Sequence, residues 1–95
     1  MKYRISWSPL AMKTYLKTLA YVLENWNLKE VTKVEKLINN KIKNLSNNGF
    51  ICPASSENKN IRKCIISKQT TLIYEINNNK IELLLFIDNR SNHKY

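Results

Sequence analysis

The sequence is poor in the residues that build nucleotide-binding loops, metal centres and disulfide scaffolds. Its 95 residues include one Gly, two Pro, two Cys and one His. A single Gly cannot form the Gly-rich loop that cradles phosphates, which excludes the common nucleotide-dependent enzymes. One His and two widely spaced Cys do not supply the three protein ligands that even a catalytic zinc takes. We therefore expect neither a metal ion nor a bound cofactor.

A membrane-spanning segment and a secretion signal are lacking as well. The longest uninterrupted apolar run, residues 83–87, is far shorter than the roughly 20 residues that cross a bilayer. The first residues show no apolar signal region and no small-residue cleavage site. We expect a cytoplasmic protein with no membrane partner. A reducing cytosol would keep Cys52 and Cys64 as free thiols, which pack as small hydrophobic side chains.

Positive charge is the property that the sequence has in excess. Lys and Arg number 16 against 7 Asp and Glu, which gives a formal net charge of +9. Such a charge predicts attraction to nucleic acid, to an acidic protein or to an anionic membrane surface, without choosing among them. The chain is long enough for one modest hydrophobic core. We predict a single domain over residues 1–95.

The first quarter of the chain predicts a short strand and then a helix. Tyr3, Ile5 and Trp7 alternate with polar residues, which is the period of a half-buried strand. Ser8 is suited to the N-cap of a helix, and Pro9 to the first helical position. The helix is expected to bury one apolar face, which comprises Ala11, Tyr15, Leu19, Leu23 and Trp26.

A second helix is predicted directly after the first. Asn27 and Glu30 form a capping box, which marks a helix start. The only glycine, Gly49, stands where a left-handed residue would end this helix. Two helices that are joined so tightly form an antiparallel hairpin. Its second helix would bury Val31, Val34, Ile38, Ile42 and Leu45.

The second half of the chain predicts a loop and three strands. Residues 50–60 show no periodicity, whereas 61–67, 71–77 and 80–88 are rich in β-branched residues and joined by short turns. The predicted fold is α+β in the order β-α-α-β-β-β, an antiparallel sheet with a helical hairpin packed on one face. The last strand is expected to direct one row of side chains to the same face, namely Ile81, Leu83, Leu85 and Ile87.

Basic and aromatic residues gather around the predicted sheet and the C-terminal tail. Such side chains can hold phosphates by charge-assisted hydrogen bonds, stack on bases, and perform acid and base steps through His and Tyr. A solvated basic surface is the alternative interpretation. The residues are Arg62, Lys63, Lys68, Tyr74, Arg90, His93, Lys94 and Tyr95.

Five short stretches occur in an order that resembles the RelE/ParE family of bacterial type II toxins. They are WSPLA at 7–11, Trp26, IRK at 61–63, LIY at 72–74 and FIDNR at 86–90. The resemblance covers essentially the whole chain. It implies a toxin that a partly disordered, acidic antitoxin neutralises by wrapping around it, in a toxin–antitoxin hetero-oligomer.

The resemblance implies one of two targets. Members similar to ParE poison DNA gyrase, and on that interpretation the chain has no catalytic residues. Its target-binding residues would then be Arg62, Lys63, Lys68, Tyr74, Arg90 and Lys94.

Members similar to RelE instead cleave messenger RNA on the ribosome. Carried over to this sequence, the residues that hold and cleave the phosphodiester would be Arg62, Arg90, His93 and Tyr95. Cys64 and Thr71 stand where the nucleases often carry basic residues, and losing such cations removes stabilisation of the charged transition state. This departure favours gyrase over the ribosome. A third possibility is a basic nucleic-acid-binding module or a decayed toxin without toxicity.

Overall fold

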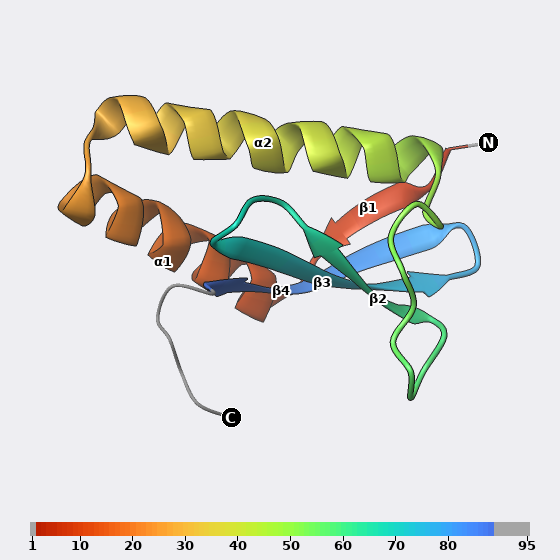
Figure 1. The fold of residues 1–95 in the computed structure, drawn as a ribbon. Helices are drawn as coiled ribbons and strands as arrows, with labels where there is room; N and C mark the ends of the chain where they lie inside the picture. The colour runs from red at the N-terminus through yellow and green to blue at the C-terminus, as the bar shows by residue number, and fades with distance from the viewer. Residues whose placement is uncertain (1, 89–95) are drawn as a thin grey trace.

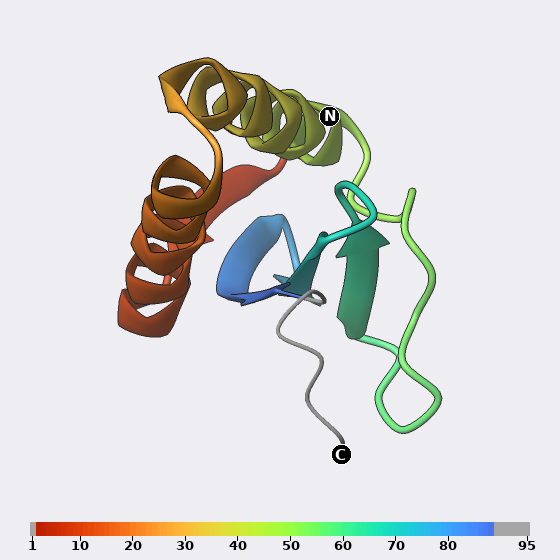
Figure 2. The same cartoon turned by 60° about the vertical axis from the view of Figure 1, so that its left-hand side comes forward.

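The computed structural model describes residues 2–88, and Met1 and residues 89–95 lie outside the description. The predicted order of elements, β-α-α-β-β-β, is confirmed. Two helices lie on one side of a four-stranded sheet (Figures 1 and 2). Neither described helix is long and apolar enough to cross a membrane. The elements are β1 (Arg4–Trp7), α1 (Pro9–Asn25), α2 (Leu28–Asn47), β2 (Ile61–Ile65), β3 (Thr70–Asn77) and β4 (Lys80–Asp88).

Both helices begin at the caps that the sequence predicts. The Ser8 hydroxyl accepts a hydrogen bond from the backbone N–H of Ala11 at 2.9 Å, and Pro9 occupies the first turn of α1. The Asn27 side chain accepts from the backbone N–H of Glu30 at 2.9 Å at the start of α2. These side chains satisfy N–H groups that have no partner inside the helix. The hairpin is therefore positioned by local sequence signals.

The glycine that follows α2, Gly49, has a different role from the predicted one. No glycine has a positive φ, so Gly49 is not a left-handed cap. It is buried instead, and a Cβ at this position would lie 3.0 Å from Ile81 Cδ1 and 3.3 Å from Tyr3 Cζ. The missing side chain thus permits the chain to pass close to the sheet.

Replacing Gly49 with alanine is therefore expected to lower the free energy of unfolding by about 1–3 kcal/mol, the usual cost of overpacking. Urea denaturation measures the difference. Asn47→Ala is the matched control, because Asn47 is exposed at the end of the same helix and a surface change should stay within about 0.5 kcal/mol. A Gly49→Ala protein as stable as the control would contradict the packing explanation.

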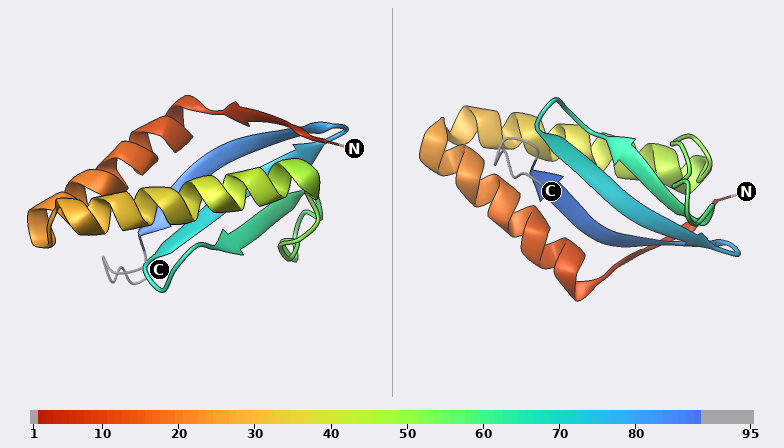
Figure 3. Two further views of the ribbon diagram at one scale, coloured as in Figure 1. Left: turned by 90° about the horizontal axis from the view of Figure 1, so that it is seen from above. Right: turned by 60° about the horizontal axis from the view of Figure 1, so that its bottom comes forward.

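The sheet has the order β1-β4-β3-β2 and is mixed, because β1 runs parallel to β4 while the other two pairs are antiparallel. The expectation of a wholly antiparallel sheet is therefore wrong for β1. The helical hairpin leads the chain away from the end of β1 and returns it to the beginning of β1. There the Tyr3 N–H donates to the Ser46 carbonyl at 2.7 Å. β2 then begins at the same end as β1, and β4 runs in the same direction (Figure 3).

A β-bulge in β4 changes which side chains reach the core. Ile73 pairs with Leu85, but the next residue, Tyr74, pairs with Leu83, so Leu84 is the extra residue. An extra residue reverses the alternation of side chains along the rest of a strand. The predicted inward row is confirmed for the part of β4 before the bulge and wrong for the part after it.

Beyond the bulge, Phe86 enters the core in place of Leu85. Phe86 is 3% exposed, whereas Leu85 is only half-buried. The start of α1 binds the irregular backbone, since the Ser8 hydroxyl donates to the Leu84 carbonyl at 2.8 Å and the Thr14 hydroxyl accepts from the Phe86 N–H at 2.9 Å. These bonds satisfy strand groups that β1 is too short to reach.

The aromatic residues divide between core and surface. Trp7, Tyr15 and Phe86 pack together, with ring centroids 5.2–5.8 Å apart. The expectation that Trp26 is a core residue is wrong, because it is 51% exposed, and Leu23 is 52% exposed. The apolar face of α1 therefore reaches the core only over its first half and Val22. The buried apolar core comprises Ala11, Val22, Ile38, Leu45, Cys52, Cys64, Leu72, Tyr74, Ile76, Ile81, Leu83 and Phe86.

Candidate functional site

The loop between α2 and β2 is fastened to the edge of the sheet by a disulfide. Cys52 and Cys64 are bonded, with their Cα atoms 5.3 Å apart, so the prediction of two free thiols is wrong. Ala54 forms an antiparallel bridge to Arg62, and the Lys63 N–H donates to the Pro53 carbonyl at 3.2 Å. This pairing brings the two Cys together, although they are 12 residues apart in the sequence.

Arg62, the candidate residue common to both toxin interpretations, holds the same loop. Its Nη1 donates to the Cys52 carbonyl at 2.7 Å, and its guanidinium lies 4.8 Å from the centre of the Phe50 ring. The Nε atom is buried without a hydrogen-bond partner. A hydrogen bond to a charged donor and a cation–π contact both stabilise this arrangement. Arg62 therefore has a structural role, because it holds the loop before β2 against the sheet.

Tyr74 is fully buried, and its hydroxyl donates to the Gly49 carbonyl at 2.7 Å. Burial raises the pKa of this hydroxyl, while the nearby Arg62 guanidinium opposes the rise. A fully buried side chain offers no surface to a partner, so we do not keep Tyr74 among the proposed target-binding residues. The β-bulge and the loop that ends α2 together enclose it, and neither is visible in the sequence around Tyr74.

The other candidate residues are dispersed. Lys63 is exposed on the face of β2 opposite to Arg62, because successive side chains of a strand alternate. Lys68 is exposed in the turn that joins β2 to β3. The structure therefore does not bring Arg62, Lys63 and Lys68 into one cluster. Four further candidates lie outside the described residues, namely Arg90, His93, Lys94 and Tyr95.

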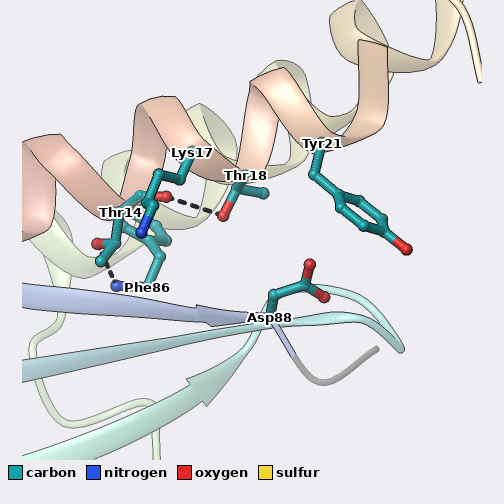
Figure 4. A pocket seen from close by; sticks show the side chains of 6 residues that line it. All are labelled: Thr14, Lys17, Thr18, Tyr21, Phe86 and Asp88. Atoms are coloured by element: carbon teal, nitrogen blue, oxygen red, sulfur yellow. Dashed lines mark hydrogen bonds between the residues drawn. The ribbon is translucent and has the colours of Figure 1, made fainter. Parts of the chain in front are cut away.

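A hollow between α1 and the end of β4 was missed by the sequence reasoning (Figure 4). Its volume is about 280 Å³. Tyr21 on α1 and Asp88 on β4 face the same opening, and Lys17 adds a cation. Thr14 and Thr18, two polar residues one helical turn apart on the inner face of α1, were the feature of the sequence that could have indicated this hollow. The lining residues are Thr14, Lys17, Thr18, Tyr21, Phe86 and Asp88.

The fold is similar to several solved toxin structures. The chromosomal ParDE toxin–antitoxin system from P. aeruginosa matches with a TM-score of 0.76 at 12% identity, covering 92% of this chain and 96% of that chain. The YoeB dimer from Staphylococcus aureus matches with a TM-score of 0.63 at 21% identity, covering both chains fully, 100% and 100%. The E. coli DinJ–YafQ toxin–antitoxin complex matches with a TM-score of 0.65 at 12% identity, covering 96% and 97%.

The sequence itself matches one family over nearly its whole length. No curated protein gives a significant sequence match. The sequence model described as the ParE toxin of the type II toxin–antitoxin system parDE matches residues 5–93. That span begins in β1 and includes every later element of the fold. The chain therefore belongs to the ParE toxin family of type II toxin–antitoxin systems.

Proposed function

We propose that the protein is a toxin that inhibits DNA gyrase and that a cognate acidic antitoxin neutralises it. The family match to ParE toxins over residues 5–93 supports this assignment. On this proposal the toxin acts by binding and needs no catalytic residue of its own. Lys63 and Lys68 are exposed and remain proposed target-binding residues, together with Arg90 and Lys94 in the C-terminal segment.

The observation that favours gyrase over messenger RNA as the target is the lack of free cations at the candidate positions of β2 and β3. Arg62 is engaged by the Cys52 carbonyl and the Phe50 ring. Cys64 is buried in a disulfide, and Thr71 is buried where a nuclease of this family would carry a cation. A developing phosphate charge would find little preorganised positive charge on β2 and β3, which typically costs orders of magnitude in rate.

The outer side of α1 supports an antitoxin partner. Leu16 is 56% exposed, and Leu23 lies on the same helix with a similar exposure. Lys13 and Lys17 are exposed beside these apolar residues. An acidic segment that folds into an amphipathic helix would bury the leucines and pair with the lysines. Two of the similar structures are themselves toxin–antitoxin systems, ParDE and DinJ–YafQ.

A supercoiling assay with purified protein tests the proposal. We expect the protein to block the supercoiling of relaxed plasmid by gyrase, and the double variant His93→Ala/Tyr95→Phe to block it equally. A type I topoisomerase that relaxes the same plasmid is the control for a general effect on DNA. Undisturbed supercoiling at a toxin excess would refute gyrase inhibition.

The alternative function predicts the opposite response to the same double variant. A ribosome-dependent endonuclease that used Arg62, Arg90, His93 and Tyr95 would lose about 10²–10⁴-fold in cleavage rate when its acid and base groups are removed. Transcripts cleaved by the wild type and left intact by the variant would therefore assign the protein to the nucleases.

A further inference from the structure

The outer face of α2 carries a row of lysines with one cation in almost every turn. Lys29, Lys33, Lys36 and Lys43 are all exposed. At 100° per residue, these four side chains project from one sector of the helix. The same sector holds three exposed amides, those of Asn40, Asn44 and Asn47.

The row faces away from the rest of the protein. Ile38 and Leu45 are fully buried on the opposite side of α2 and pack in the core. Figure 1 shows α2 along the top of the molecule, and in Figure 3 no other described element covers its outer side. The row is thus open to a partner along its whole length.

The two carboxylates of α2 lie outside the row. Glu30 is half-buried in the first turn, where it suits the positive end of the helix dipole. Glu35 is half-buried. The pKa of Tyr15 is raised mainly by burial and secondly by the negative charge of Glu35, which places Glu35 on the side towards α1. Glu30 still lines the same surface hollow as Lys29, Lys33 and Lys36, so it offsets part of their charge and leaves the row with a net positive charge.

We propose that this face of α2 binds the phosphate backbone of duplex DNA. From Lys29 to Lys43 the helix rises about 21 Å, and successive cations of the row lie about 4.5 to 10.5 Å apart along the axis. Duplex DNA presents a continuous line of phosphates at a comparable or closer spacing. Lysines would neutralise the phosphates, and the asparagine amides between them would donate hydrogen bonds to phosphate oxygens.

The chemistry of the row favours a duplex over the other polyanions. Residues 28–47 contain no aromatic side chain on which an unpaired base could stack, which argues against single-stranded nucleic acid. An antitoxin helix would need apolar surface to bury, and the row offers only Leu37 at its margin. Three exposed leucines, Leu10, Leu16 and Leu23, lie on α1 instead, and Leu28 lies at the first position of α2, outside the row.

The inference goes beyond gyrase inhibition and is tested without the enzyme. We would measure the anisotropy of a labelled 20-bp DNA duplex with the full-length protein between 50 and 200 mM salt. Four neutralised phosphates predict a slope of about −3.6 for the logarithm of affinity against the logarithm of salt concentration. Lys33→Gln/Lys36→Gln should make the slope less steep by about 1.8 and weaken binding at least about tenfold at 100 mM salt.

A charge-matched variant controls for net charge. Lys59→Gln/Lys80→Gln also removes two exposed cations, but from the loop before β2 and from the first residue of β4, and it should keep most of the affinity and the slope. Equal losses in the two double variants would overturn the assignment to α2. Absence of binding at 50 mM salt would overturn DNA binding, and tighter binding to single strands or to duplex RNA would overturn the choice of duplex DNA.

Discussion

Replacing Phe86 with alanine is expected to lower the free energy of unfolding by about 3–5 kcal/mol, the usual cost of deleting a buried aromatic ring. Phe86 is 3% exposed and packs against Trp7 and Tyr15. The side chains around it belong to β1 and α1, so the cavity would open where three elements meet. Urea denaturation followed by circular dichroism measures the loss.

The neighbouring substitution Leu85→Ala is the matched control. Leu85 lies after the bulge on the face opposite to the helices, and we expect its loss to cost less than about 1.5 kcal/mol. Simple alternation along the strand predicts the reverse order, with Leu85 in the core. A Leu85→Ala protein less stable than the Phe86→Ala protein would therefore contradict the bulge.

Removing the disulfide has the second largest expected effect. The bond joins residues 12 apart, and a loop of this length is expected to contribute about 3 kcal/mol by restricting the unfolded chain. The double variant Cys52→Ala/Cys64→Ala should lose about that much stability in urea. The loop that Arg62 holds would then be retained by noncovalent contacts, among them the Nη1 hydrogen bond, the Phe50 contact and the backbone pairing.

A reductant provides the control for this prediction. It should destabilise the wild-type protein by a similar amount and leave the double variant unchanged. If the wild-type protein unfolds at the same urea concentration with and without reductant, the Cys52–Cys64 bond does not contribute as expected.

Local signals in the sequence predicted the elements of the fold well. Ser8, Pro9 and Asn27 act on backbone groups within three residues, so their positions identify the helix starts without knowledge of the rest of the chain. Gly49 also marked the end of α2, but for a different reason. Its neighbours Tyr3 and Ile81 are distant in the sequence, and only the assembled sheet brings them close.

The candidate site was less predictable because it depends on contacts between distant segments. Arg62 binds a carbonyl that lies 10 residues earlier, and Tyr74 binds one that lies 25 residues earlier. Nothing in the sequence around Arg62 or Tyr74 predicts these hydrogen-bond partners. The row of lysines on α2 could be predicted from its spacing alone, but the position of Glu35 on the side towards α1 follows only from the packing of the helices.

Inhibition of gyrase in the cell is tested by induced expression of the wild-type protein in a bacterial host, with plasmid supercoiling and messenger RNA integrity measured in the same cultures. Gyrase inhibition predicts growth arrest with relaxed or linearised plasmid and intact transcripts. Fragmented transcripts with normally supercoiled plasmid would contradict it and assign the toxicity to a nuclease. Normal growth with neither change would contradict toxicity itself.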